Sequence, residues 1–330
     1  MPRRPGQGPR DLSKPLEQIE ILVEDVCDGW RLDRTLQHYL PWRSRTGVVR
    51  LIDGGYVDHR GETRASRKVV KGEVIVVRIP MAPVPDVGPT DCEIPILHED
   101  EWVVVVDKPA GLAVHPAGKR VYGTLIHFLH KRYRSDRPEH DVVPRLLHRI
   151  DRETSGVLAA GLEEISHGQI RAQFEERTVR KVYLAVVHGC PKPTEGVIDL
   201  ALGPARRSEI RLKQEVRDDG LRAETHYRVV ETNGRHSLVE LTPHTGRTHQ
   251  LRVHMAAIGC PLVGDKLYGV REEVFLEYLQ GEISEANREQ LILDRHALHS
   301  ARLRFWHPGV EETVEYEAPL PADMAALLER

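Results

Sequence analysis

The chain has 330 residues, of which 40% are hydrophobic and 29% are charged. This composition is typical of a globular protein and excludes disorder throughout, and the length suits about two domains. No apolar run approaches the roughly 18 residues that a membrane span requires, so we expect no membrane partner.

The cysteines and the N-terminus bear on the compartment. Four cysteines lie far apart with no C-x-x-C pair, at Cys27, Cys92, Cys190 and Cys260. This spacing indicates neither a zinc site nor a disulfide framework. The stretch 1–10 is basic and rich in Pro and Gly, but it lacks the apolar segment of a secretory signal. We therefore expect a cytoplasmic protein with a disordered tail over 1–18.

The net charge of −3 conceals an uneven distribution. Residues 1–90 hold 15 Lys and Arg against 12 Asp and Glu, whereas the rest of the chain is acidic. Much of the acidity lies in the stretch 271–290, for which the sequence indicates no function. Because contact with nucleic acid depends on a local basic surface, the net charge does not exclude an RNA partner.

The first predicted elements are two short helices and two strands. Leucines recur every fourth residue over 31–40, which predicts a helix with one apolar face. A second helix is expected over 45–53, after which a Gly-Gly pair breaks the chain. Strands are expected at 56–58 and 74–79.

A proline-rich stretch divides the chain. Residues 80–89 contain four prolines and can form neither a helix nor a central strand. We predict a semi-extended linker over 81–90, between an N-terminal domain at 19–80 and a second domain at 91–330.

Strands and helices are mixed after this linker. The sequence predicts strands at 102–106, 157–160, 181–188 and 238–241, and helices at 163–177 and 248–258. Gly259 and Pro261 end the last helix. The mixture predicts an α+β domain built on a mixed sheet.

Basic residues are concentrated in the N-terminal domain. Residues 41–80 hold nine Lys and Arg against four Asp and Glu. Such a surface would neutralise phosphates, although the charge alone fits a solvated Arg-rich surface equally well.

The order of residues in that domain is more specific. The runs RLDRTL at 31–36, SR at 44–45, LIDGGYV at 51–57 and GEVI at 72–75 resemble the α-L RNA-binding motif of a small-subunit ribosomal protein. The stretch 58–61 departs from that motif, which has a shorter Asn-Gly turn there. The resemblance implies that the helix pair, with Arg45 and Arg50, binds structured RNA.

The segment His148–Gly156, HRIDRETSG, precedes a predicted strand. Asp151 would therefore lie at the end of a sheet, where loops gather and sites form. Arg149 and Arg152 flank it, and cations so close would lower its pKa and keep it ionised, as nucleophilic catalysis requires. From these residues alone, a salt-bridged turn is the stronger interpretation.

Four segments in order carry a resemblance to a known family. They are HRIDRETSG at 148–156 for H-R-L-D-x-x-T-S-G, DKPAGLAVHP at 107–116 for N-K-P-x-G-L-x-V-H-P, KVYLA at 181–185 for K-x-Y-x-A, and GRTHQLRVH at 246–254 for G-R-[ST]-H-Q-[IL]-R-x-H. These motifs are similar to those of RluA-type pseudouridine synthases, in particular the RluD-like group that acts on large-subunit ribosomal RNA. Ile150 and Asp107 depart from the pattern, and the match covers essentially all of 90–330.

The resemblance implies an isomerase that converts uridine in RNA to pseudouridine. Neither redox change nor hydrolysis occurs, so no metal, nucleotide or other cofactor is implied. The implied fold is a mixed, mainly antiparallel sheet flanked by helices. We expect a monomer whose partner is RNA, with ribosomal RNA favoured over transfer RNA.

The resemblance also implies roles for single residues. Asp151 would be the nucleophile and would attack either the ribose or the pyrimidine ring. Tyr183 would stack on the target uracil, and Arg252 would pair with Asp151. Without the motifs, Tyr183 would be interpreted as a core tyrosine and Arg252 as a surface arginine.

Further residues are expected to contact RNA. Eversion of the target base leaves a space that a long planar cation can fill, and the resemblance implies this role for Arg149. His148, Arg152, Arg247 and His115 are also expected at the RNA. His249 and His254 are five residues apart and so do not align as a metal-binding pair on a helix.

Two hypotheses from other classes stay open. One is a non-catalytic RNA-binding protein in which Asp151 is structural. The other is a metal-dependent RNA hydrolase, which needs clustered carboxylates near a divalent ion, whereas the key motif has one Asp.

Overall fold

The computed structural model describes residues 18–40, 45–58, 64–78, 93–116, 123–133 and 142–329. The predicted tail, up to residue 17, and the predicted linker over 81–90 lie outside these ranges. Among the described residues, no helix is both long enough and apolar enough to cross a membrane.

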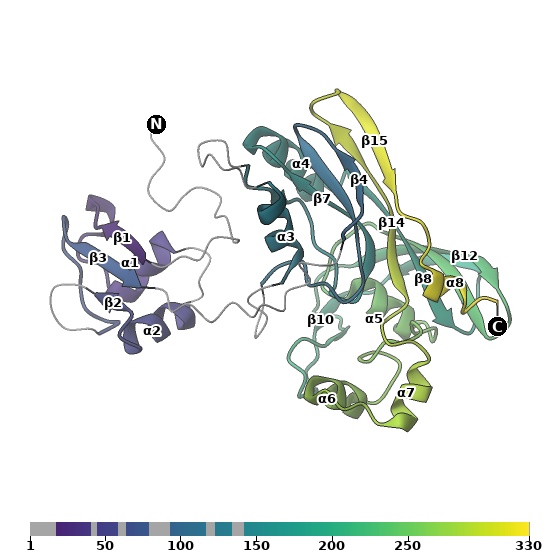
Figure 1. Ribbon diagram of the computed structural model, residues 1–330. Helices are drawn as coiled ribbons and strands as arrows, with labels where there is room; N and C mark the ends of the chain where they lie inside the picture. The colour runs from purple at the N-terminus through teal and green to yellow at the C-terminus, as the bar shows by residue number, and fades with distance from the viewer. Residues whose placement is uncertain are drawn as a thin grey trace.

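A small N-terminal unit contains one three-stranded antiparallel sheet and two helices (Figure 1). Its elements are β1 (Gln18–Leu22), the 3-10 turn η1 (Asp25–Cys27), α1 (Leu32–Tyr39), α2 (Arg45–Asp53), β2 (Val57–Asp58) and β3 (Val74–Arg78), with the strands in the order β1-β3-β2. Leu32, Leu36 and Leu40 are fully buried in its core, as their spacing predicted. No sequence pattern predicted β1.

The second unit is built on one large sheet. Its strands are β4 (Ile96–Glu99), β5 (Val103–Lys108), β6 (Arg145–Leu146), β7 (Ser155–Gly161), β8 (Arg180–His188), β9 (Glu195–Asp199), β12 (Glu224–Thr232), β13 (His236–Pro243), β14 (Leu298–His307) and β15 (Glu312–Glu317). The order is β4-β5-β7-β14-β8-β13-β12-β9, with β15 on β14 and β6 on β7. Only β14 and β7 pair in parallel among the described strands, so the prediction of a mixed, mainly antiparallel sheet is confirmed.

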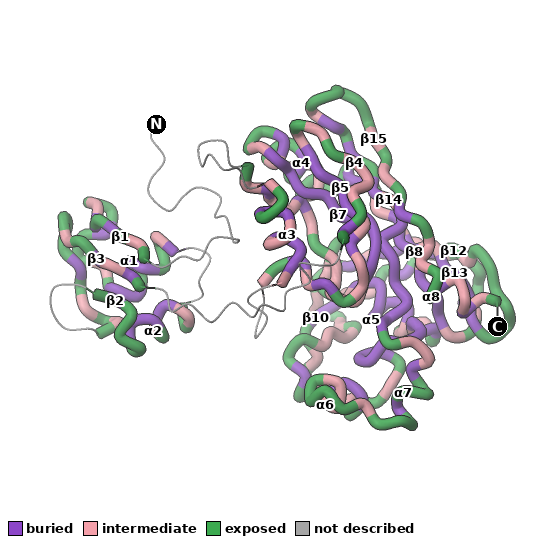
Figure 2. The backbone as a smooth tube through the Cα atoms, in the orientation of Figure 1, coloured by how far each residue is buried: buried purple, intermediate pink, exposed green. Residues whose placement is uncertain are grey.

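Helices and a small second sheet complete this unit. The helices are α3 (Leu125–Arg132), α4 (Glu164–Glu176), α5 (Gln250–Ala257), α6 (Glu272–Gln280), α7 (Glu285–Leu291) and α8 (Ala322–Ala325), and the small sheet pairs β10 (Leu202–Pro204) with β11 (Gln214–Val216). Figure 2 shows buried residues concentrated along the central strands. Val103–Val106 are all buried, since apolar side chains pack against both faces of β5.

Most predicted elements after the linker are present with shifted ends. The helix predicted from residue 248 begins at Gln250, because His249 before it has a left-handed backbone with φ of 57°. The acidic stretch 271–290 forms α6 and most of α7, and Val274 and Phe275 of α6 are buried. This stretch is therefore packed into the fold through its apolar side chains.

A close backbone approach connects the HRIDRETSG segment to the sheet. Gly156 has a φ of 107°, and a Cβ there would clash with the carbonyl of Ser300 on β14. Only glycine tolerates that position, where β7 pairs in parallel with β14. The segment before it, with Asp151, is held at the end of these strands.

Candidate active site

A cavity of about 470 Å³ opens at this end of the sheet. Its walls come from the loop 147–151, from the start of β8 and from the segment 243–252 that leads into α5. Its size lies in the range of sites that hold small organic ligands. Asp151, Tyr183 and Arg252 all line it.

Asp151 is held by an arginine that a second carboxylate orients. Nη1 of Arg252 donates to Oδ2 of Asp151 at 3.0 Å. The other edge of the same guanidinium donates to Asp265, from Nε at 2.7 Å and from Nη2 at 2.9 Å. Oδ1 of Asp265 also accepts the backbone N–H groups of Leu267 and Tyr268. Arg252 is thus fixed from behind and presents one N–H to Asp151.

Asp151 is ionised near neutral pH. Burial is the largest single effect and raises its pKa, but the charges of Arg252 and two nearby histidines, with the hydrogen bond from Arg252, together lower the pKa below the usual value. His249 and His296 would lower it only when protonated. Burial lowers the pKa of His249 to about 4 and that of His296 to about 3, so both imidazoles are neutral near pH 7. Arg252 is therefore the cation that keeps Asp151 charged.

Tyr183 belongs to the apolar wall of the cavity. It is 8% exposed and packs in one cluster with Leu251 and Leu298. Burial, partly offset by a hydrogen bond from Ser300, raises its pKa to about 12, and the charge of Asp151 adds to the increase. The phenol is therefore neutral near pH 7. Strand alternation places it on the face opposite Val182 and Leu184.

A hydrogen-bond chain sets the proton of His249. The backbone N–H of Gln214 donates to the Tyr268 hydroxyl at 3.0 Å, and that hydroxyl lies 2.8 Å from Nδ1 of His249. The hydroxyl oxygen accepts from Gln214 and can still donate its own proton to Nδ1. The proton of the neutral imidazole is then on Nε2, which lies 4.0 Å from Oδ2 of Asp151.

A buried lysine connects two of the motif segments. Nζ of Lys108 donates to the carbonyl oxygens of Pro109, Leu112 and Arg152 at 2.8 to 3.0 Å. Burial lowers the pKa of Lys108 to about 7, while three carbonyl acceptors match the three N–H groups of its charged form. Lys108 therefore ties the loop after β5 to the segment that carries Asp151.

Comparison with known proteins gives one consistent result. The family model described as RNA pseudouridylate synthase matches residues 102–257. An uncharacterized RNA pseudouridine synthase of Bacillus subtilis is 36% identical over 316 residues, which are 95% of this chain and 98% of the relative. A ribosomal large subunit pseudouridine synthase D of Xanthomonas campestris is 36% identical over 321 residues, 96% of this chain and 94% of the relative. The chain belongs to the RNA pseudouridine synthases.

Solved structures of other synthases share the fold. Human RNA Pseudouridylate Synthase Domain Containing 4 aligns with a TM-score of 0.56 at 28% identity, over 71% of this chain and 92% of that one. Human RNA Pseudouridylate Synthase Domain Containing 1 aligns with a TM-score of 0.53 at 28% identity, over 69% and 83%. The synthase is therefore an isomerase that acts on RNA, as the motifs implied.

The cavity of the synthase brings together six of the ten predicted site residues. They are Asp151, Tyr183, Arg252, Arg149, His148 and Arg247. The other four do not line it: Arg152, His115, Arg45 and Arg50.

The three predicted RNA-contact residues that line the cavity differ in their surroundings. Arg149 is exposed. Arg247 donates from Nε to the carbonyl of Arg222 at 3.0 Å. His148 stacks on Phe174, and its Nε2 accepts the backbone N–H of Ala159, while burial lowers its pKa to about 3. His148 is therefore a neutral part of the wall.

The four residues outside the cavity lie on two parts of the molecule. The guanidinium of Arg152 turns away to Glu153, at 3.5 Å, so the cation that pairs with Asp151 is Arg252 and not this flanking arginine. His115 is exposed. Arg45 and Arg50 are exposed on α2 of the N-terminal unit, and Arg45 lies 3.2 Å from Asp33.

Sequence analysis did not identify Asp265. Asp265 follows α5 in the stretch Gly-Asp-Lys-Leu-Tyr, which shows no helical or strand periodicity. An acidic residue beside a glycine, taken alone, does not predict a place in the active site. The structure explains the glycine beside it, because at Gly264 a φ of 74° and the nearby carbonyl of Arg295 leave no room for a side chain.

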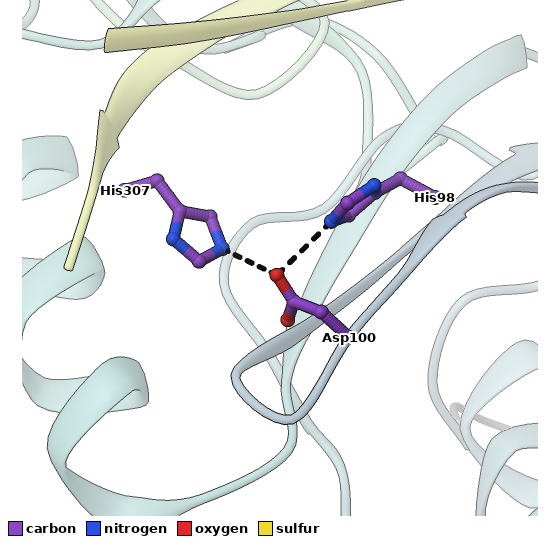
Figure 3. Close-up of side chains that lie close together, drawn as sticks. All are labelled: His98, Asp100 and His307. Carbon is purple, nitrogen blue, oxygen red and sulfur yellow. Dashed lines mark hydrogen bonds and ion pairs between the residues drawn. The ribbon is translucent and has the colours of Figure 1, made fainter. Parts of the chain in front are cut away.

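A second polar cluster lies where the β4–β5 turn meets the end of β14. Nε2 of His98 and Nε2 of His307 each lie 3.1 Å from Oδ2 of Asp100 (Figure 3). A metal ion would need lone pairs on both nitrogens. However, Nδ1 of His307 accepts the backbone N–H of Gly309 at 3.1 Å, which places the proton of the neutral ring on Nε2. We therefore assign this cluster to polar contacts that join two turns of the synthase.

Proposed function

We propose that Asp151 is the nucleophile that opens the glycosidic bond of the target uridine. The observation that carries this proposal is an ionised carboxylate, 30% exposed in a cavity, with one oxygen held by Arg252. Attack occurs at either the anomeric carbon or the pyrimidine ring. The N1–C1′ bond breaks, the C5–C1′ bond forms, C5 loses a proton and N1 gains one, so atoms and charge balance without a cofactor.

Tyr183 and Arg252 orient the reacting groups in this proposal. The ring of Tyr183 faces the cavity that holds Asp151, where it can stack on the uracil. A phenol with a pKa near 12 keeps its proton at neutral pH, so Tyr183 acts as a platform and hydrogen-bond donor and not as a phenolate base. Arg252 holds Asp151 in one rotamer and is itself fixed by Asp265.

His249 contributes a fixed hydrogen-bond donor. Its Nε2–H lies near Asp151 because Tyr268 engages Nδ1. That proton can stabilise negative charge on the carboxylate or on a uracil oxygen. The proton of a neutral imidazole would be free to occupy either nitrogen without Tyr268.

RNA reaches the site through basic side chains. Arg149, exposed at the cavity, takes the place of the everted base, and Arg247 lies on the same wall. The N-terminal unit, predicted to be an α-L RNA-binding domain over 19–80, adds exposed Arg45 and Arg50 for phosphate contact.

We propose large-subunit ribosomal RNA as the substrate. Relatives from Xanthomonas campestris and Zymomonas mobilis, 36% and 35% identical, are named ribosomal large subunit pseudouridine synthase D. Transfer RNA is the alternative within the same chemistry. We further propose that the enzyme works as a monomer in the cytoplasm, where its substrate is found, and needs no nucleotide cofactor.

The experiment that tests this function compares RNA from cells that carry different versions of the gene. Pseudouridines in total RNA are mapped by carbodiimide-induced stops of reverse transcription in cells with the native chain, without it, and with Asp151→Asn. The matched control is Asp218→Asn, which makes the same change at an exposed position of the catalytic domain.

The outcomes separate the hypotheses. We expect stops in large-subunit ribosomal RNA that disappear in the deletion and in Asp151→Asn and remain in Asp218→Asn. Stops that occur in transfer RNA alone would identify transfer RNA as the substrate. Stops that persist with Asp151→Asn would exclude Asp151 as the nucleophile and favour a structural role for it.

A further inference from the structure

Two cations on one side of the cavity have no acidic partner among the described residues. Arg177 follows α4 and Lys181 lies at the start of β8, and both line the cavity with Asp151. Neither side chain makes a hydrogen bond or an ion pair with any residue that the structure describes. They lie close enough to each other that the charge of Arg177 disfavours protonation of Lys181.

The other buried or partly buried cations of the cavity are engaged. Arg252 is paired with Asp151 and Asp265, and Arg247 donates to a backbone carbonyl. Arg149 and Arg177 are both exposed to water. Lys181 is the partly buried cation of this cavity for which the structure describes no acceptor, and exposed Arg177 lies close enough to repel it.

This arrangement costs free energy in the empty protein. Lys181 is partly buried, and burial together with Arg177 lowers its pKa. A partly desolvated cation without a partner is destabilising, and the like charge of nearby Arg177 adds to the cost for Lys181. An anion placed between them would relieve both effects.

The position along the strand indicates which anion fits. Lys181 and Tyr183 are two residues apart on β8, so they point to the same face about 6.6 Å from each other. A nucleotide whose base stacks on Tyr183 carries its phosphate one ribose away from that base. Its phosphate can therefore reach Lys181 while the ribose stays near Asp151.

We propose that Arg177 and Lys181 form a phosphate-binding subsite, which holds a backbone phosphodiester of the substrate RNA beside the everted nucleotide. The proposal rests on the proposed function, because it uses the same cavity. Phosphate contacts position a nucleic acid without reading its sequence. The subsite thus serves to place the target ribose and base against Asp151 and Tyr183, whatever the neighbouring bases are.

Charge-removing variants test the subsite. Lys181→Met removes the ammonium group and keeps a long unbranched side chain. In Arg177→Gly the charge is lost without backbone strain, because Arg177 has a φ of 63°. Lys181→Arg keeps the charge, and Arg171→Gln is the matched control on exposed α4, where Arg171 pairs with Glu175.

The readouts are steady-state kinetics and salt dependence with the full-length protein and an RNA fragment that contains its target uridine. We expect KM to rise about tenfold in each charge-removing variant with little change in kcat, since a hydrogen bond to a charged group is lost. The slope of log affinity against log salt should fall by about 0.7 for one single-strand phosphate. Lys181→Arg and Arg171→Gln should behave like the native chain.

A neutral phosphate analogue identifies the contact. Single methylphosphonates are placed at each position around the target uridine. We expect one position to weaken binding to the native protein and to have no further effect on Lys181→Met. The urea unfolding midpoint of Lys181→Met should be equal to or higher than the native one, because a partly buried cation without a described partner has been removed.

The opposite results overturn the subsite. If KM and the salt slope are unchanged in both charge-removing variants, the subsite is refuted. A loss of kcat alone also refutes it, because it would indicate that Lys181 only supports Tyr183. A native protein that converts no uridine would refute the proposed function itself. Should Lys181→Met fail to fold, Arg177→Gly and the methylphosphonate series with the native chain still decide the matter.

Discussion

Removal of the carboxylate of Asp265 tests how the site is held together. Asp265→Asn preserves the shape of the side chain but replaces one oxygen, which accepts from Nε of Arg252 at 2.7 Å, with an N–H donor. Two donors then face each other in a region where the Asp265 side chain has no exposed surface and that of Arg252 has 8%.

The stability cost follows from that burial. Breaking a buried ion pair by removing one partner costs about 3–5 kcal/mol. For a domain of this size we expect a fall in melting temperature of about 10 °C. Circular dichroism during thermal unfolding measures it, and Asp218→Asn should leave the transition in place because that residue is exposed.

The pH dependence supplies a second measure. Burial raises the pKa of Asp265, but Arg252 and its backbone donors lower it to about 2, below the usual 3.8. Its ionised form therefore contributes stability that is present above about pH 4 and is lost as the pH falls towards 2. In Asp265→Asn this part of the acid sensitivity should disappear.

Activity should fall for a reason other than protonation of Asp151. Once Asp265 is neutral, Asp151 is the remaining carboxylate beside Arg252, so its ionised form becomes more favourable. We expect kcat to fall with the acid limb of the kcat profile unchanged or at lower pH. Native stability, or an acid limb at higher pH, would refute the argument that Asp265 positions Arg252.

Two further predictions concern the surroundings of the site. Tyr268→Phe removes the donor to Nδ1 of His249, so kcat should fall several-fold while RNA affinity is retained. When His249→Asn is already present, Tyr268→Phe should cause no further fall in kcat. Additive losses of the two variants in single-turnover assays would contradict the hydrogen-bond chain. Lys108→Met leaves three carbonyl oxygens without their donor and should destabilise the fold by about 3 kcal/mol or more; an unchanged urea midpoint would show that Lys108 does not fasten the two loops.

Local patterns were sufficient for many elements. The leucine spacing of α1 and the β-branched run of β5 predicted both elements correctly, since each depends on neighbours in sequence. The motifs predicted that Asp151, Tyr183 and Arg252 would meet in one cavity, and the structure brings them there. Their chemical roles remain proposals.

Contacts between distant segments were beyond local patterns. The parallel pairing of β14 with β7 joins residues far apart in the chain and leaves no periodic signal in either segment. The late start of α5 results from the left-handed backbone of His249, which the sequence did not reveal. Asp265 reaches Arg252 only because the loop after α5 folds back, so a single acidic residue there had no predictive value.

The central claim is that the carboxylate at position 151 makes a transient bond to the target nucleotide. Tritium release from RNA that carries [5-³H]uridine, measured in a single turnover with excess purified protein, follows loss of the C5 proton directly. We expect release with the native chain and with Asp218→Asn, and none above background with Asp151→Asn although that variant still binds the RNA. Release by Asp151→Asn at the native rate would contradict the account.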